Sequence, residues 1–385
     1  MGSLSNELQR ILFWVSLILP TYVYLGYPLL LASGLLGRRR GVRKGKLLPK
    51  VSVIVPARNE EKGIESKLES LLAQEYPKEC LEILVGSDGS TDGTERIVQR
   101  SADRGVHLVV SAQPRGKSAV QNELVGRSSG SILVFTDADC HVPPEAVRRL
   151  VENFADSTVG LVSALPRYVN ADATEITSNE SLYLRYESWM RGQESDRGLL
   201  AMASGALFAM RRCLWQPLDS TVGDDFVLPL QTVLHGYRNV LEPGLVAKTH
   251  LTQARAHLML RMKTRIVSKD LRGLYQNRRI LNPLRTGAVA VALWSHKLLR
   301  WSVPYFLLVL FVSNLFLLDR PAYAVAMLLQ GLFYTLALAD VLGGGRHFKF
   351  PLSVATSFCV VNFGALLGTL HCLCGRTSGQ WGTVR

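Results

Sequence analysis

The chain has 385 residues, of which 48% are hydrophobic and 19% are charged, and its formal net charge is +13. This apolar content excludes a disordered chain, and six cysteines in this length exclude a fold built on disulfides. The length suits about two domain-sized units, and the excess of basic residues is compatible with nucleic acid, a membrane face or a phosphate-rich ligand.

The positive charge is concentrated in two short segments. Residues 38–50 hold seven Lys and Arg and no acid, and residues 251–301 hold 11 bases against Asp270 alone. The block between them, residues 51–250, holds 20 bases and 27 acids. No nucleic acid is expected as a partner, because this central block is acidic and its bases lack the interleaved aromatic residues of a strand-binding groove.

The first predicted element is an N-terminal transmembrane helix within residues 1–37. Residues 11–37 carry no charge, and at about 1.5 Å per residue they can cross a hydrocarbon core of about 30 Å. A signal peptide is the alternative, but the apolar stretch is too long and no small-residue cleavage site follows it. The basic juxtamembrane linker, residues 38–50, places the chain after it on the cytoplasmic side.

Residues 51–253 are predicted to form a cytoplasmic α/β domain. Residues 51–55 have the pattern of a buried strand and are followed by a helical stretch to about residue 73. Residues 81–85 and 132–135 repeat the strand pattern. Strands that alternate with helices predict a mostly parallel sheet.

The rest of the chain is predicted to lie on or in a membrane. In residues 254–301, apolar positions alternate with Lys and Arg, which is typical of basic amphipathic interfacial helices; solvated helix faces are the alternative. Residues 302–375 hold three apolar runs, predicted as transmembrane segments, and residues 376–385 form a tail. Four crossings that start outside would leave this tail outside, against the positive-inside bias. A re-entrant segment is the alternative.

Four polar clusters fall in loops that follow predicted strands, where open α/β sheets bind ligands. They are Pro-Ala-Arg-Asn-Glu-Glu at 56–61, Ser-Asp-Gly-Ser-Thr-Asp-Gly-Thr at 87–94, Thr-Asp-Ala-Asp at 136–139 and Gly-Asp-Asp at 223–225. The two carboxylates of the third cluster lie one residue apart, and such like charges cost energy unless a cation neutralises them. A divalent metal that bridges to a diphosphate would do so, because hard cations prefer carboxylate and phosphate oxygens.

Together with Gly-Lys-Ser-Ala at 116–119 and Ser-Gly-Ala at 204–206, these clusters occur in an order typical of one family. The chain from about residue 50 to 275 resembles a membrane-embedded family 2 glycosyltransferase, a group that includes ceramide glucosyltransferase-like enzymes and the cellulose, chitin and hyaluronan synthases. The resemblance implies an α/β GT-A catalytic domain beside an α-helical transmembrane region. It also implies a nucleotide-sugar donor and a Mg²⁺ or Mn²⁺ ion.

The resemblance assigns roles to individual positions. Asp225 takes the place of the catalytic general base. The expected nucleotide-binding residues are Pro56, Arg58, Glu60, Asp88, Lys117, Asp137 and Arg265. The expected metal ligands are Asp139 and Asp137, with His250 as a further candidate for which a structural role is the alternative. The acceptor side is assigned Ser204, Gly205, Asp224 and Trp189, the last with core or interface packing as the alternative.

One base without a covalent nucleophile implies a single displacement with inversion, so an α-linked nucleotide sugar is expected to give a β-glycoside. Processive members of the family carry Gln-x-x-Arg-Trp, whereas residues 262–266 are Met-Lys-Thr-Arg-Ile and keep only the arginine. We therefore expect a hexosyl- or N-acetylhexosaminyltransferase that moves single sugars, from a UDP-sugar by default, to a lipid or lipid-linked acceptor. The expected location is the cytoplasmic face of a bacterial inner membrane.

Two alternatives to this function stay open. The first is a processive polysaccharide synthase that also translocates its polymer. The second is a non-catalytic membrane scaffold that retains the fold, and it is disfavoured because Asp137, Asp139 and Asp225 are all present.

Overall fold

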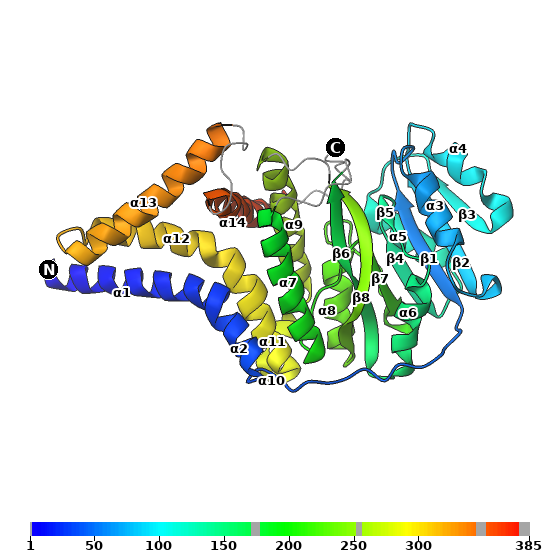
Figure 1. Ribbon diagram of the computed structural model, residues 1–385, viewed down its shortest axis with the longest axis horizontal. Coiled ribbons are helices and arrows are strands. Elements are labelled where there is room, and N and C mark those ends of the chain that lie inside the picture. The colour runs from blue at the N-terminus through cyan, green and yellow to red at the C-terminus, as the bar shows by residue number, and fades with distance from the viewer. Residues whose placement is uncertain (1, 171–177, 252–255, 344–351, 377–385) are drawn as a thin grey trace.

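The computed structural model describes residues 2–170, 178–251, 256–343 and 352–376. Figure 1 shows an α/β domain on one side of the molecule and a group of long helices on the other. The helices α7 (Ser178–Asp196) and α9 (Ala256–Gln276) lie between the two parts. The chain therefore combines an α/β domain with a helical region, as the sequence predicts.

Within the described residues, eight strands form one sheet in the order β3-β2-β1-β4-β7-β6-β8-β5. The strands are β1 (Val51–Ala57), β2 (Leu81–Asp88), β3 (Val106–Ser111), β4 (Ile132–Thr136), β5 (Cys140–His141), β6 (Val159–Asn170), β7 (Leu207–Arg211) and β8 (Arg238–Leu251). β1 pairs in parallel with β2 and β4, β2 with β3, and β6 with β8. The antiparallel pairs are β4–β7, β6–β7 and β5–β8. This mixed, mostly parallel sheet confirms the expected fold class.

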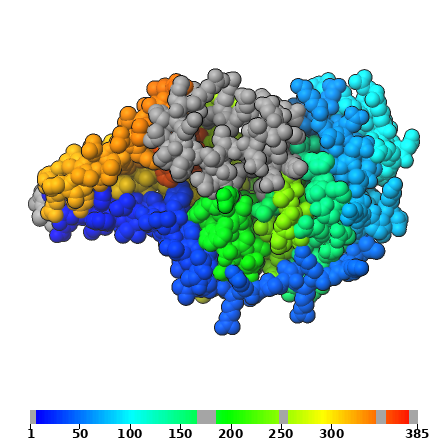
Figure 2. Space-filling model, viewed as in Figure 1, coloured from blue at the N-terminus to red at the C-terminus, as the bar shows by residue number. Residues whose placement is uncertain are grey.

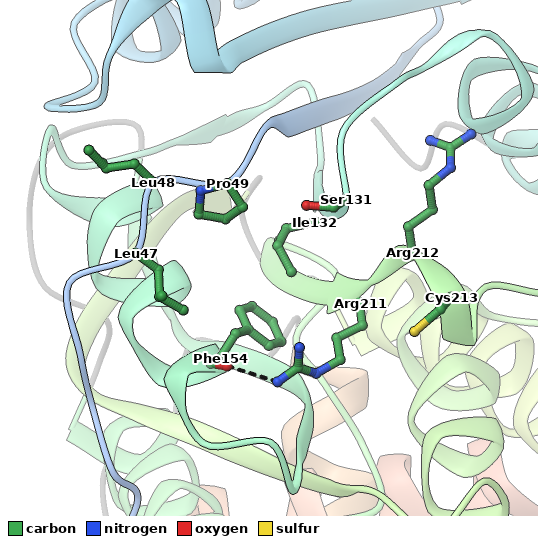
Figure 3. Close-up of a pocket in the computed structure, with 9 residues that line it drawn as sticks. All are labelled: Leu47, Leu48, Pro49, Ser131, Ile132, Phe154, Arg211, Arg212 and Cys213. Atoms are coloured by element: carbon green, nitrogen blue, oxygen red, sulfur yellow. Dashed lines mark hydrogen bonds between the residues drawn. The ribbon is translucent and has the colours of Figure 1, made fainter.

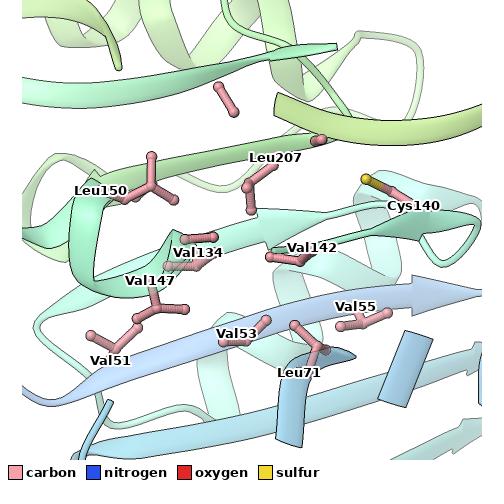
Figure 4. Packing of buried hydrophobic residues seen from close by; sticks show 14 of the residues in the cluster. Val51, Val53, Val55, Leu71, Val134, Cys140, Val142, Val147, Leu150 and Leu207 are labelled. Carbon is pink, nitrogen blue, oxygen red and sulfur yellow. The ribbon is translucent and has the colours of Figure 1, made fainter. Parts of the chain in front are cut away.

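Helices cover both faces of the sheet because strand side chains alternate between the faces. The helices of this domain are α3 (Ile64–Leu72), α4 (Thr94–Gln99), α5 (Lys117–Arg127), α6 (Ala146–Glu152) and α8 (Asp224–Leu234). On one face, Val53 and Val55 of β1 pack with Leu71 of α3 and Leu150 of α6, as Figure 4 shows. Ile54 points to the other face and belongs to the cluster that contains α5 and α8 side chains.

The other helices of the described chain are α1 (Gly2–Thr21), α2 (Tyr27–Ser33), α10 (Pro283–Thr286), α11 (Ala288–Leu293), α12 (Leu299–Leu315), α13 (Pro321–Leu342) and α14 (Leu352–Leu373). A π-helical turn joins α1 to α2 at Tyr22–Gly26, and another joins α11 to α12 at Trp294–Leu298. Both helices bend there in Figure 1, and the Tyr22 and Ser295 hydroxyls hydrogen bond at 2.8 Å. The bends let α2 and α11 pack against the α/β domain while α1 and α12 project away from it.

Four helical segments of the described chain are long and apolar enough to cross a membrane: Asn6–Ser33, Ala288–Leu315, Pro321–Leu342 and Val354–Leu373. Figure 2 shows helices α1, α12 and α13 projecting together from the α/β domain. The second segment begins at Ala288, within the range in which the sequence predicts interfacial helices. It does so because α11 and α12 continue through the π-helical turn as one helix.

Candidate active site

The candidate active site lies at the edge of the sheet where β1, β2 and β4 end. These strands are parallel, so Arg58, Asp88 and Asp137, which end or follow them, lie at one edge. β7 is antiparallel to β4 and pairs Leu207 with Thr136. The segment just before β7, which contains Gly205, therefore lies at the same edge.

The residues predicted to line the nucleotide pocket follow β1. Pro56 is buried in the strand, Arg58 is half-buried in the next loop, and Glu60 is buried. The backbone N–H of Glu60 donates to Thr94 Oγ1 at 2.8 Å, which ties this loop to the start of α4. The fold thus places these residues beside one another at the candidate site, and their contact with a nucleotide stays a prediction.

Asp88 is fully buried and holds the loop that precedes α5. Its carboxylate accepts the backbone N–H of Arg115 at 2.6 Å and that of Gly116 at 2.9 Å. Gly116 has a φ of 91°, a region that favours glycine. Through this loop, Asp88 positions Lys117, the next residue along the chain. Its predicted contact with the nucleotide base or ribose stays a prediction.

Lys117 joins two predicted site carboxylates. Its Nζ lies 2.8 Å from Asp137 Oδ1 and 3.1 Å from Asp224 Oδ1. Although burial lowers the pKa of Lys117, the charges of Asp137 and Asp224 raise it above its ordinary value, so the amine is protonated. Gln121, one turn along α5, donates to Asp224 Oδ2 at 2.7 Å. Asp224 is thus buried and paired behind the site, and its predicted acceptor role stays untested.

Asp225, the predicted general base, lies in the first turn of α8 and is half-buried. A Cβ added to Gly205 would lie 3.4 Å from Asp137 Oδ2 and 3.5 Å from Asp225 Oδ2, so both carboxylates approach this glycine. Burial and then the charge of Asp224 raise the pKa of Asp225 to about 6. At neutral pH such a carboxylate is ionised and is a stronger base than an ordinary Asp.

Helix α9 brings three charged residues toward this acid cluster. Arg265 is exposed and Lys269, one turn later, is half-buried. Burial and then the charge of Arg265 lower the pKa of Lys269, while Asp224 acts in the opposite direction. A Cβ added to Gly223 would lie 3.0 Å from Asp225 Oδ1 and 3.8 Å from Asp270 Oδ1. The basic helix therefore contributes an acid, Asp270, beside the predicted base.

Asp137 and Asp139 follow β4 and are both half-buried. Beneath them, Lys67 of α3 is fully buried and donates from Nζ to Thr136 Oγ1 at 2.6 Å and to the Cys140 carbonyl at 2.8 Å. Burial lowers the pKa of Lys67 to about 8, against the opposing charges of nearby acids. The two hydrogen bonds hold the residues on either side of the Asp-x-Asp turn.

The residues at this edge fit a divalent ion by donor chemistry, since Asp137 and Asp139 supply carboxylate oxygens, which hard cations prefer. Among the described side chains, no group of three or more His, Cys, Asp and Glu surrounds a common point. The side chain of His250 lies outside the described part of the structure. Its backbone lies in β8, where Cys140 pairs with Thr249. His250 follows Thr249 and Asp139 precedes Cys140, so this pairing brings the two residues into the same part of the sheet edge.

The predicted acceptor-side residues are spread over two places. Ser204 is buried, and its backbone N–H donates to Ser163 Oγ at 2.9 Å. Gly205, next to it, lies at the carboxylates described above. Trp189 is on α7, with 41% of its surface exposed. Sugar stacking by Trp189 stays a prediction.

Gln121, Lys269 and Asp270 are site residues that the sequence motifs do not reveal. Gln121 lies one helical turn after Lys117, and Lys269 lies one turn after Arg265, so i,i+4 spacing from an assigned residue was the available signal. Asp270 is the single acid in residues 251–301. A lone acid in a basic helix is the signal that would have identified it.

A surface cleft of ≈ 710 Å³ lies at the opposite end of the strands, near the start of β1 and β4. Figure 3 shows its lining, which includes Leu48, Phe154, Arg211 and Arg212. Arg211 donates to the Phe154 carbonyl at 2.8 Å, and Arg212 donates to the Val125 carbonyl at the same distance. Both guanidinium groups cap backbone carbonyls here, and the cleft lies away from the strand-end carboxylates of the candidate site.

The raised pKa of Asp225 predicts the acid limb of the pH profile. A base works only when deprotonated, so we expect kcat/KM for sugar transfer to rise with pH up to about 6 and to level off above it. An Asp with the ordinary pKa of 3.8 would place this break about two pH units lower. Initial rates at acceptor concentrations well below KM, measured between about pH 4.5 and about 8, give kcat/KM and test this. A profile that stays flat down to pH 5 would contradict it.

Comparison with known proteins agrees with this site. The family model "Glycosyl transferase family 2" matches residues 52–216. A probable glycosyltransferase of Bacillus subtilis, YdaM, is 31% identical over 212 residues, which cover 52% of this chain and 50% of that protein. A beta-monoglucosyldiacylglycerol synthase of Synechocystis is 27% identical over 200 residues, 49% of this chain and 41% of that protein. The chain thus spans half or less of the length of these two curated relatives.

Among solved structures, the mannosyltransferase PcManGT of Pyrobaculum calidifontis, in complex with GDP-Man and Mn²⁺, superposes with a TM-score of 0.70. The alignment covers 95% of this chain and 99% of that one at 23% identity. This likeness establishes that the two chains share a fold.

The α/β domain is therefore a glycosyltransferase domain of GT-A fold. More particularly, residues 52–216 of this domain match the family 2 glycosyltransferase model, which confirms the resemblance seen in the sequence motifs and supports the expectation that the domain is an enzyme.

Proposed function

We propose that this protein is an inverting, metal-dependent glycosyltransferase that moves one sugar from a nucleotide donor to a lipid acceptor at the cytoplasmic membrane face. The observation that carries the proposal is the position of Asp225: its carboxylate and that of Asp137 lie 3.5 Å and 3.4 Å from a Cβ added to Gly205, so both face one point. The Asp-x-Asp residues would hold the donor diphosphate on one side of this point. The base would act on the acceptor hydroxyl on the other.

The chain's own residues define most of the chemistry. Asp225 accepts the proton of the acceptor hydroxyl as that oxygen attacks the anomeric carbon, and the nucleoside diphosphate leaves on the opposite side. Lys117, held between Asp137 and Asp224, keeps a positive charge beside the position expected for the diphosphate. A divalent ion bound by Asp137 and Asp139 would neutralise further charge on the leaving phosphates.

A lipid acceptor is supported by the position of the site and by the relatives. The described helices that reach the site, α8 and α9, pack against the apolar helical region, so a head group at the membrane surface would lie near Asp225. The Synechocystis and Nostoc relatives are beta-monoglucosyldiacylglycerol synthases. UDP-sugars are the first donors to test, and GDP-sugars follow because PcManGT is described in complex with GDP-Man.

The direct test is a product screen. Purified protein in detergent, with Mg²⁺ or Mn²⁺, is incubated with UDP- and GDP-sugars and with short-chain diacylglycerol or polyprenyl phosphate, and the lipids are analysed by mass spectrometry. We expect one glycolipid that carries a single additional sugar with inverted configuration. Donor hydrolysis without any glycolipid, for every donor and acceptor, would reject the lipid-acceptor proposal.

A processive synthase is the second candidate, because the poly-beta-1,6-N-acetyl-D-glucosamine synthases of Staphylococcus aureus are 24% identical over 201 residues. The same screen separates the two activities. A processive enzyme would give a ladder of products or a polymer in the absence of an added lipid.

The proposed metal site predicts a role for His250. We expect His250→Ala to weaken Mn²⁺ binding by roughly 10–100-fold, because loss of a metal-site partner has effects of that order. Binding is measured by the electron paramagnetic resonance signal of free Mn²⁺ in the presence of a nucleoside diphosphate. His257→Ala, on α9, is the matched control and should leave the affinity unchanged. Equal affinities for the two variants would remove His250 from the site.

A further inference from the structure

Helix α14 differs from the other three apolar segments in its direction. In Figure 1, α1, α12 and α13 lie near the plane of the picture, whereas α14 is seen nearly along its axis. A helix of 22 residues is about 33 Å long, so this strong foreshortening means that α14 runs across the other three. Helices that span one bilayer are tilted from its normal by only about 20° on average, so helices that span together are expected to run in similar directions.

The packing of α14 sets its depth relative to a charged helix. A Cβ added to Gly364 would lie 2.8 Å from Lys263 Cβ, and one added to Gly368 would lie 2.8 Å from the Thr264 carbonyl oxygen. The two glycines, spaced four apart, thus allow close contact between helix surfaces. Gly364 lies at the middle of the Val354–Leu373 segment, and Gly368 lies one turn later. The middle of α14 is therefore at the same level as the middle of α9.

α9 cannot lie at the centre of a bilayer. Around the contact it carries Arg261, Lys263 and Arg265, and the first and last of these are exposed. A Lys or Arg side chain at the bilayer centre is strongly unfavourable. α9 also carries Asp270 beside the candidate active site, which must stay in contact with water-soluble donors. The middle of α14 is consequently held at the level of the catalytic domain.

Two features of α14 agree with a position at the membrane surface. Near its start, Thr356 donates to Asp340 Oδ2 at 2.7 Å, and Asp340 lies in the last turn of α13, where that helix leaves the apolar region. Farther along, Phe363 and Leu370, seven residues apart and so on one face of the helix, are 51% and 44% exposed. This apolar face lies on a different side of the helix from the two glycines that pack on α9.

The distribution of charged residues on the two sides of the membrane distinguishes three crossings from four. With three, the outer side holds Glu7 with Arg10, and Asp319 with Arg320, each pair neutral. The cytoplasmic side then holds both basic segments, residues 38–50 and 251–301, and the bases that follow α13. With four crossings, Arg376 and the residues after it would be outside. The positive-inside bias favours three.

We propose that the chain crosses the membrane three times and that α14 is an interfacial helix, whose Phe363–Leu370 face contacts the lipids of the cytoplasmic leaflet. Four crossings would put the basic C-terminal residues outside, against the positive-inside bias. Three crossings put them on the cytoplasmic side. In this arrangement α14 and α9 together form the surface of the catalytic domain that faces the membrane. The proposal goes beyond the enzymatic function and does not depend on the identity of donor or acceptor.

The test is the sidedness of single cysteines. The native cysteines are replaced by Ala except for Cys374, which is exposed just after α14. Two reference proteins keep only Cys213, exposed in the catalytic domain, or carry only Asp319→Cys between α12 and α13. The full chain is labelled with a charged, membrane-impermeant maleimide in right-side-out and in inverted membrane vesicles.

We expect Cys374 to be labelled from the same side as Cys213 and to be protected on the side where Asp319→Cys reacts. Labelling of Cys374 together with Asp319→Cys would establish a fourth crossing and overturn the proposal. Arg376→Cys is a second reporter, two residues further from the helix and also exposed. Labelling of Cys213 from the outside, with Cys374 on the same side, would keep α14 at the interface and reject only the cytoplasmic orientation in the proposed function.

Discussion

Replacing Asp225 with Asn is expected to lower the rate of sugar transfer by about 10²–10⁴-fold, the usual contribution of a general base. The amide of Asn has nearly the same shape as the carboxylate but cannot take the acceptor proton. Asp225 makes no ion pair with Lys117, which is held by Asp137 and Asp224. The diphosphate end of the site should therefore keep its geometry, and nucleotide affinity should change little.

The two effects are measured separately on one preparation. Transfer is followed with a labelled nucleotide sugar and extracted lipid, and nucleotide affinity is followed by titration calorimetry. Asp219→Asn is the matched control, because Asp219 lies six residues earlier, is exposed and only caps Thr221. A variant at position 225 that keeps more than about a tenth of the rate would place the base elsewhere.

Replacing Lys117 with Met is expected to have the largest effect on stability among the site residues. Met preserves much of the side-chain volume but leaves Asp137 and Asp224 without their shared cation, and Asp224 is only 5% exposed. Breaking a buried pair in this way costs about 3 kcal/mol. For a domain of this size that corresponds to a fall of roughly 6–12 °C in the melting temperature.

The measurement is thermal unfolding of the detergent-solubilised protein, compared at one scan rate. Arg115→Met is the control, since Arg115 pairs with Glu123 at the surface and such pairs contribute about 1 kcal/mol or less. The double variant Lys117→Met, Asp224→Asn removes the unpaired carboxylate and should recover part of the loss. If Lys117→Met were as stable as Arg115→Met, the Lys117 amine would not be the cation that compensates these acids.

Much of the site was predictable because its residues lie in strand-end loops, where chain order and spatial order coincide. Asp88 and Asp137 follow hydrophobic strand runs, and parallel strands bring such ends to one edge of a sheet. Lys117 and Asp225 were predictable through their motifs, which place them at the first turns of α5 and α8. In each case one short segment both indicates the local secondary structure and contains the site residue.

Other site residues were not predictable because they depend on contacts between distant segments. Asp270 has no motif, and it joins the site only because α9 packs against α8 and brings its carboxylate near Asp225. The sequence pattern around Lys67 is that of a surface lysine on an amphipathic helix. In the structure, however, Lys67 is buried beneath the turn that follows β4. No local pattern distinguishes these residues from solvated charges.

The amino-acid sequence by itself determined the class of the enzyme, the strand-end carboxylates and the presence of apolar segments long enough to cross a membrane. These properties depend on residue type and on short-range periodicity, which the chain carries wherever it folds. The tertiary structure alone decided which carboxylates share Lys117, why the pKa of Asp225 is raised and how α14 lies against α9. Those features arise from burial and from close approach between segments far apart in the chain, and both exist only after folding.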